Sequence, residues 1–513
     1  MARTLALRRG DFWLKVATGL TFVVVADQVL LHIRVSSIGW VLVVLPLLAV
    51  ITRPVLRRDW RALVCFCLAT LMALGNFADP SWLAWSLFWV FAGMGALMPG
   101  VGQFGDAWQW GQRLAWFAVR SCIAPLLDLR RVIKARRGRG QLRRHLPHLV
   151  LPALGSWTIL TLFAQANPMI GIGLDNAFDA MFPGFAAERL SFVWPTLLTF
   201  GWCLLRPRAR PRVLATFDGS SSREIPGFTV QSVRLSLIAF NALFAMQNLM
   251  DLAWLWRLAP LPKGMTLAGY AHRAADPLIV TALLAAGFVL VALRPGSQTA
   301  AVPWIRRLVV LWVAQNVLLV GNAALRTVDY IAASSLTALR ISALLWMGLV
   351  ALGLVLVLWR VLFDKSASWL INANAAAALG LLMGCCVVDL DTVAARYNIA
   401  HARELGGGGA PLDICYLQAM GPSALLPLAE LEQRRTPPLI HVWAQWLREN
   451  DQRTLIWSQG HIQWTWLGAR RLAAVPEALH LHALPGDASL YPDCRERNIH
   501  VLRIALGLSL IHI

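Results

Sequence analysis

Apolar residues gather in eleven stretches that are separated by short polar and basic segments. A helix of about 20 apolar residues crosses the roughly 30 Å hydrocarbon core of a bilayer, because it satisfies its own backbone hydrogen bonds. The pattern therefore predicts an all-α, polytopic transmembrane bundle of about eleven spans. In chain order, the predicted spans are residues 12–32, 38–51, 62–77, 81–98, 149–165, 190–205, 230–255, 277–293, 308–325, 341–363 and 369–390.

Arginine and lysine fall in every second loop of this predicted bundle. Residues 53–61, 130–144 and 206–212 are rich in them, whereas residues 175–188 carry acids instead. Cytoplasmic loops hold the excess of Arg and Lys, so we expect the N-terminus to lie in the cytoplasm. With an odd number of spans in residues 1–391, the C-terminal region is then predicted on the periplasmic side of a bacterial inner membrane.

Residues 100–147 form a long loop that mixes Trp with Gln, Asp and Arg. This segment is too polar to span, and its tryptophans suit the boundary between headgroups and acyl chains, so it is predicted to lie along the cytoplasmic interface. Its basic part, residues 130–144, is expected to attract anionic lipid, at about 1 kcal/mol per cation near the surface. The alternative is a stop-transfer anchor without lipid specificity.

The chain becomes mixed in polarity after residue 391. Residues 392–447 are predicted to form a small extramembrane array of helices, with a break at residues 406–409, and residues 448–513 have no clear assignment. The last six residues, Leu-Ser-Leu-Ile-His-Ile, are similar to the translated mosaic end of a transposon used in sequencing adapters, so we expect them to be an artefact. Cys415 and Cys494 could form a disulfide if this region is periplasmic, or stay unpaired.

Composition supports the membrane class and excludes others. The chain is 58% hydrophobic and 14% charged, with a mean hydropathy of +0.58, which is unusual for a soluble domain. The net charge of +20 is spread over loops rather than one soluble module, so no nucleic-acid partner is expected. The other six cysteines lie in or beside apolar segments without metal-site spacing, so neither metal nor cofactor is predicted.

Two stretches carry a family resemblance. Residues 330–340 read YIAASSLTALR and end in the pattern L-T-x-x-R before a long span, and a second stretch reads ARYN from residue 394 and LDICYL from residue 412. Both resemble an uncharacterised bacterial family of multi-pass membrane proteins, the domain of unknown function DUF4173, which is similar to DUF4153. The resemblance covers about residues 230–428, and it implies an architecture but no substrate.

Four residues of the second stretch match the family pattern: Arg396, Asn398, Asp413 and Tyr416. His401 stands where the family pattern leads us to expect Arg, and Ser335 in the first stretch stands where we expect Gly. We expect the four matching residues to form a hydrogen-bonded cluster that ties the C-terminal helices to the membrane rim. The alternative is a site for a ligand or a protein partner.

Polar side chains recur on two of the predicted spans. The span at 230–255 carries Arg234, Asn241, Asn248 and Asp251, and the span at 308–325 carries Gln315 and Asn322, with Arg326 and Asp329 just beyond it. Intervals of three, four and seven place each set on one helical face. Such residues inside a membrane usually face protein or water. They predict a polar route or binding cleft between the two spans, or alternatively interhelical hydrogen bonds of about 0.6 kcal/mol each.

Sequence signatures of soluble nucleotide, zinc-protease and serine-hydrolase chemistry are missing. An intramembrane enzyme is disfavoured, because no acid and base with recognisable spacing lie within the spans. Two functional hypotheses follow. One is transport or lipid handling through the polar faces of the two spans, and the other is a non-catalytic sensor or assembly protein that binds a partner through its C-terminal region.

Overall fold

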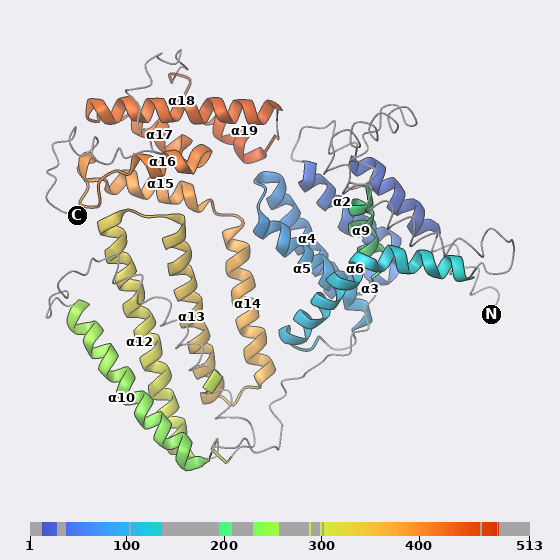
Figure 1. Ribbon diagram of the computed structural model, residues 1–513, viewed down its shortest axis with the longest axis horizontal. Helices are drawn as coiled ribbons and strands as arrows, with labels where there is room; N and C mark the ends of the chain where they lie inside the picture. Colours follow the sequence, from blue (N-terminus) through green and yellow to red (C-terminus); the bar gives the residue numbers. More distant parts are fainter. Residues whose placement is uncertain are drawn as a thin grey trace, which may run out of the picture. The chain divides into compact units, whose positions relative to one another are not determined.

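The computed structural model describes residues 13–27, 37–101, 104–135, 194–207, 229–255, 287–288, 298–299, 302–461, 464–479 and 481. The elements in these ranges are helices, and no strand is found among them (Figure 1). The chain divides into two compact units, Met1–Ala215 and Thr216–Ile513.

The first unit is built from apolar helices and one amphipathic helix. Residues 13–27 are helical. The elements that follow are α2 (Ser37–Thr52), α3 (Pro54–Arg58), α4 (Trp60–Ala78), α5 (Trp82–Leu97), η1 (Met98–Gly100), α6 (Ala107–Ala135) and α9 (Trp194–Leu205). Helices α2 and α4 approach so closely at Gly39 that a Cβ there would lie 2.7 Å from backbone atoms of Phe77. Only glycine allows that approach.

Helix α6 has two apolar faces. Trp110, Phe117 and Ala124 recur every seven residues and are buried, whereas Val119 and Ile123 are exposed. The helix has the length of a span but is not among the helices apolar enough to cross a bilayer. The interfacial position of this helix stays a prediction.

In the described part of the second unit, four helices of span length precede a C-terminal group of helices, of which α18 is also long (Figure 1). The four, which we call the long helices, are α10 (Val230–Leu255), α12 (Pro303–Ser334), α13 (Ala338–Leu362) and α14 (Ala367–Cys385). The rest are α15 (Leu390–His401), η3 (Arg403–Leu405), α16 (Ile414–Met420), η4 (Gly421–Ser423), α17 (Leu425–Glu432), α18 (Pro438–His461) and α19 (Trp466–Ala473). We call residues 390–473 the C-terminal cap.

Helix directions follow from the turns and contacts. Short turns at residues 335–337 and 363–366 make α13 antiparallel to both α12 and α14. Helix α10 runs parallel to α12, because successive positions on the two helices meet in rising order: 241 with 308, 248 with 315 and 251 with 326. At one end of these helices an apolar core forms around Val233, Leu237, Ile305, Val309, Val357 and Val361.

The cap has its own core and packs on the turn between α12 and α13. Its buried residues include Ile399, Leu417, Leu428 and Leu447, and Ile331 and Leu336 join the same cluster. The predicted break at residues 406–409 is a folded turn in which Gly409 donates a hydrogen bond to the carbonyl of His401, the last residue of α15, and Gly407 donates to the carbonyl of the next residue, Ala402. A Cβ at Gly407 would lie 2.4 Å from the His401 carbonyl, so the turn requires glycine.

Among the described residues, six helices are long and apolar enough to cross a membrane: Trp60–Ala78, Trp82–Gly100, Val230–Ala253, Pro303–Ser334, Ala338–Leu362 and Ala367–Cys385. Two shorter apolar helices, Gly39–Thr52 and Trp194–Leu205, coincide with predicted spans. The predicted span at 149–165 lies outside the described residues, as does nearly all of the one at 277–293. The all-α class is thus confirmed, whereas the number of eleven spans stays a prediction.

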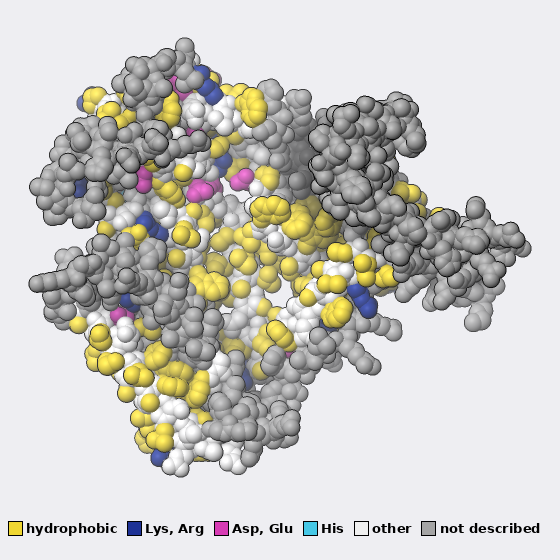
Figure 2. Space-filling view, in the orientation of Figure 1, with side chains coloured by type: hydrophobic (Ala, Val, Ile, Leu, Met, Phe, Trp, Pro, Cys, Tyr) yellow, Lys and Arg dark blue, Asp and Glu magenta, His cyan; other side chains and the backbone are white. Residues whose placement is uncertain are grey.

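The surface of the long helices is suited to lipid. Leu235, Leu243, Leu249 and Met250 on α10 are all more than half exposed, and hydrophobic side chains cover much of the described surface in Figure 2. Apolar patches of this extent are rare on soluble monomers and mark contact with a membrane or another protein. These faces fit a membrane-embedded protein.

Candidate functional site

The polar stripes of α10 and α12 meet along the contact between the two helices. The Asn241 amide nitrogen donates to the Leu308 carbonyl oxygen at 3.1 Å, and the Gln315 amide nitrogen donates to Asn241 Oδ1 at 3.3 Å. Seven residues further on, Asn248 donates to the Gln315 carbonyl at 3.1 Å and accepts from the Asn322 amide at 3.4 Å. We call this set of contacts the amide ladder.

The amide ladder ends in a buried ion pair. Arg326 Nη2 lies 3.1 Å from Asp251 Oδ2, and the two side chains are 4% and 1% exposed. The Gln247 amide donates to the other carboxylate oxygen at 3.0 Å. Removing one partner from such a pair strands a buried charge, at a cost of about 3–5 kcal/mol.

Six of the seven predicted intramembrane residues are therefore brought together: Asn241, Asn248, Asp251, Gln315, Asn322 and Arg326. Arg234 lies outside the ladder, with its side chain exposed near the start of α10, and Asp329 is exposed on α12. Gln247 is a member that sequence reasoning missed, because it stands one residue away from the predicted stripe.

The family residues of the cap hold the turn between α12 and α13. Asn398 forms a double hydrogen bond with the Leu336 backbone: its Oδ1 accepts from Leu336 N at 2.6 Å, and its Nδ2 donates to Leu336 O at 2.8 Å. The Tyr416 hydroxyl accepts from Ala338 N at 2.9 Å. We call these contacts the turn clamp, and they join the two stretches that carried the family resemblance.

Ser335 explains why glycine suits the first position of this turn. Its φ of +70° lies in the region that side chains with a Cβ rarely adopt. Arg340 stabilises the same turn, because its guanidinium donates to the Ser334 carbonyl at 2.6 Å and lies 4.1 Å from the Tyr330 ring centroid. The strained residue is thus surrounded by contacts that hold it in place.

The other two family residues do not contact the turn itself. Arg396 forms an ion pair with Glu430 at 3.3 Å, in which both side chains are at least half exposed. The Asp413 carboxylate begins α16 by accepting from Tyr416 N at 2.9 Å. The four family residues therefore do not form one cluster.

A second polar group joins α19 to the start of α15. Asp389 accepts hydrogen bonds from Thr392 and forms an ion pair with Arg471, which also donates to the Ser423 hydroxyl at 3.2 Å. Burial alone would raise the pKa of Asp389, but these hydrogen bonds and the Arg471 charge outweigh it and lower the pKa. Sequence reasoning missed this group because its members lie up to 82 residues apart.

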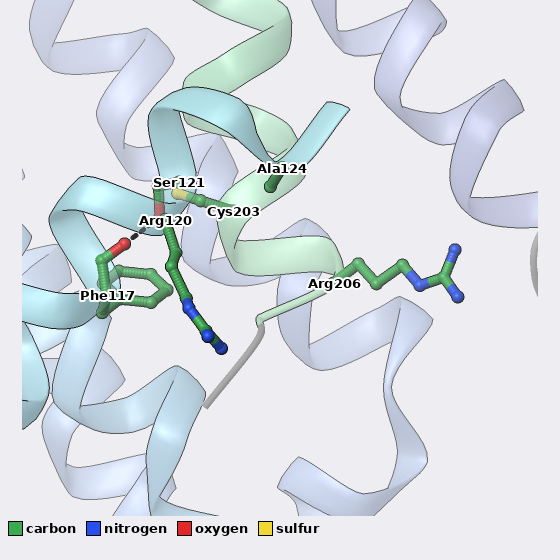
Figure 3. A pocket seen from close by; sticks show the side chains of 6 residues that line it. All are labelled: Phe117, Arg120, Ser121, Ala124, Cys203 and Arg206. Atoms are coloured by element: carbon green, nitrogen blue, oxygen red, sulfur yellow. Dashed lines mark hydrogen bonds between the residues drawn. The ribbon is translucent and has the colours of Figure 1, made fainter. Parts of the chain in front are cut away.

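The first unit has a small hollow between α6 and α9 (Figure 3). Phe117, Arg120, Ser121, Ala124, Cys203 and Arg206 line it. Two of its polar side chains already have partners: the Ser121 hydroxyl donates to the Phe117 carbonyl at 2.6 Å, and Arg206 lies 3.2 Å from the buried Asp128 carboxylate. Anionic lipid at the adjacent basic loop stays a prediction, because residues 136–144 lie outside the described ranges.

Within the described ranges, no group of three His, Cys, Asp or Glu side chains is placed to hold a metal ion. Cys415 takes part in a disulfide bond, whereas Cys494, its predicted partner, lies outside the described residues.

Apolar helices with lipid-suited faces and a polar seam between two of them define a membrane-embedded helical protein of unknown function. The chain belongs to the family described as "Domain of unknown function (DUF4153)", whose model matches residues 62–431. The match begins well before residue 230, so the relationship extends into the first unit, which the sequence resemblance left out. Comparisons with curated proteins and with solved structures give no match.

The turn clamp predicts a large effect at Asn398. Asn398→Ala leaves a buried N–H and a buried carbonyl of Leu336 without partners, so we expect a loss of about 2–4 kcal/mol in the free energy of unfolding. Arg396→Ala, two residues away, removes only an exposed ion pair and should cost less than about 1 kcal/mol. Thermal unfolding of both variants in detergent measures the difference, and equal melting temperatures would contradict the clamp.

Asp451 on α18 predicts a pH dependence. It is 4% exposed, its Oδ2 has no partner within the described part of the chain, and burial raises its pKa from 3.8 to about 7. The folded state therefore keeps a proton that the unfolded state releases, so stability falls as the pH rises from about 4 to 7. Above pH 7 the full cost is present, up to about 4 kcal/mol.

Asp451→Asn should accordingly raise the melting temperature at pH 8 and change it little at pH 4. Glu430→Gln, at an exposed cap residue, is the matched control and should leave the pH profile unchanged. A profile that is the same for Asp451→Asn and the unmodified protein would show that Asp451 does not titrate as described.

Proposed function

We propose that this protein transports or handles a polar or amphipathic ligand, such as a lipid, at the contact between α10 and α12. The observation that carries the proposal is the Asp251–Arg326 pair, which is nearly inaccessible between two helices of span length and continues the amide ladder. Ionisable residues within a membrane are costly to keep, and they commonly mark ion or substrate pathways.

The amide ladder is more consistent with a contact that opens and closes than with a permanent pore. Most of its amide atoms satisfy one another, and Gln315 Oε1 is a buried acceptor without a hydrogen-bond partner among the described residues, so only limited hydrogen-bonding capacity is left for a ligand while the helices are together. A polar ligand that separated the two helices could form hydrogen bonds with the same amides. An apolar contact would offer it no such partners. Separation of α10 from α12 at the ion pair is the proposed motion.

We also infer eleven crossings in a plasma membrane, with the N-terminus in the cytoplasm and the C-terminal cap outside. Arg234, Arg306, Arg307 and Lys365 lie at the end of the long helices that is remote from the cap, and an excess of cations favours the cytoplasmic side. The parallel directions of α10 and α12 require an odd number of crossings between them, which supports the predicted span at 277–293.

Partner binding by the cap is the second candidate. It is favoured by apolar side chains that remain exposed on α18, namely Val442, Ile456 and Trp457. In this alternative, variants of the α10–α12 ion pair keep the biological phenotype, whereas polar substitutions of the exposed α18 residues lose it.

Neutralising the ion pair tests the proposed function. Asp251→Asn or Arg326→Gln alone should lower stability by about 3–5 kcal/mol, whereas the double variant removes both charges and should recover most of that loss. We expect none of the three to complement deletion of the gene. Complementation and thermal unfolding in detergent are measured together, with Asp329→Asn, an exposed acid of the same helix, as the control.

The double variant separates function from packing. If it regains both stability and complementation, the pair only holds the helices together and the proposal is wrong. Full complementation by both single variants would be equally decisive against it.

Topology is tested by single cysteines in a background without the free native thiols. Arg435→Cys, on the exposed surface of the cap, should react with a membrane-impermeant maleimide in intact spheroplasts. Lys365→Cys, in the turn between α13 and α14, should react only after permeabilisation. Labelling of both from the same side would show that the predicted orientation or the number of crossings is wrong.

A further inference from the structure

A group of cations lies at the end of α12 and α13 that is remote from the cap. In this end region, the described residues include five cations, Arg234, Arg306, Arg307, Arg360 and Lys365, and a single acid, Asp364. We call the group the basic end. Arg306 reaches across from α12 to α13, where its guanidinium donates to the Val361 carbonyl and to Asp364 Oδ1, the latter at 3.1 Å.

Arg360 differs from the other cations because it is buried with no acidic partner among the described residues. Its side chain is 5% exposed, and its Nε has no hydrogen-bond partner among the described residues. The one described acid of the basic end does not compensate it, since Asp364 is 84% exposed on its side-chain surface and pairs with Arg306. A buried guanidinium without an anion is strongly unfavourable, so Arg360 favours binding of an anionic group.

The surroundings of Arg360 mark the level of the lipid headgroups. Trp304 is 66% exposed with Arg307 stacked at 5.3 Å from its ring, and Trp359 and Phe363 form an exposed ring pair with centroids 4.6 Å apart. Tryptophan and arginine gather where acyl chains meet headgroups. A guanidinium at this depth lies within reach of lipid phosphates.

We infer that the basic end binds the phosphate of an anionic phospholipid, with Arg360 as its buried ligand and Arg306 and Lys365 beside it. The planar guanidinium matches two phosphate oxygens at once, and the acyl chains find apolar helix surface next to it. The exposed Leu362 and Phe363 provide such surface. This site is distinct from the loop at 130–144, and it does not depend on the proposed function at α10 and α12.

The test is lipid retention by the purified full-length protein, delipidated in detergent and measured by native mass spectrometry. Wild type should retain phosphatidylglycerol over phosphatidylcholine by at least about fivefold, the factor that one near-surface cation contributes. Arg360→Gln should abolish this preference. Arg307→Gln removes the same charge from an exposed, Trp-stacked side chain and should keep most of it.

Two further measurements distinguish the alternatives. High salt should leave the wild-type preference largely intact, because a desolvated pair is poorly screened, and a preference that disappears at 0.5 M salt, where about 4 Å of screening length remains, would indicate diffuse attraction only. Inorganic phosphate should not displace the lipid. Displacement by it would show that the ligand is a soluble phosphate and overturn the lipid assignment.

If Arg360→Gln does not fold, the wild-type protein alone can test whether the basic end binds anionic phospholipid. A photoactivatable phosphatidylglycerol should label peptides that contain residues 357–369. Labelling confined to other parts of the chain would refute the site, as would an unchanged lipid preference in a folded Arg360→Gln variant.

Discussion

A polar group buried among apolar helices must find its partner on a neighbouring helix, and this constraint sets the register of the second unit. Between α10 and α12 the partners are amides at heptad intervals, where a shift by one residue would leave several of them unsatisfied. Single asparagines at such positions fix register in coiled coils by the same means. The apolar core around Val309 and Leu237 supplies packing, but it would tolerate more than one alignment of the helices.

The three polar regions of this unit, namely the turn clamp, the Asp251–Arg326 pair and Arg360, differ in how their buried polar groups are satisfied. The turn clamp is satisfied by neutral hydrogen bonds and joins two backbone segments, so it serves structure well. The Asp251–Arg326 pair is satisfied but charged, and a pair of amides would hold the helices at lower cost. Arg360 is charged, and its Nε has no partner among the described residues. A role beyond folding is therefore least needed to explain the turn clamp, more needed for the Asp251–Arg326 pair, and most needed for Arg360.

Periodicity in the sequence predicted much of this arrangement, and its failures have physical reasons. The start expected for α10 coincides with the observed one, because apolar character and helix begin together at Val230. Helix α12 is longer than its predicted span, since Arg306 and Asp329 interrupt the apolar run but not the backbone hydrogen bonds. A spacing of seven placed Asn241 and Asn248 on one face, yet it could not reveal their partners about 70 residues away. The burial of Asp451 and Arg360 has no local signature, because it depends on packing between elements.

Helix α12 connects the turn clamp, the Asp251–Arg326 pair and the basic end, so a movement of this helix affects all three. It carries Arg306 at its first turn, Arg326 two turns before its end, and the clamped residues 335–337 directly after that end. An unbroken helix of 32 residues is about 48 Å long and moves nearly as a rigid body. Separation at the ion pair therefore cannot remain local: α12 must tilt against the turn clamp, shift Arg306 at the basic end, or bend. Since the clamp holds Leu336 by two buried hydrogen bonds, tilting about that end is the least costly of these motions.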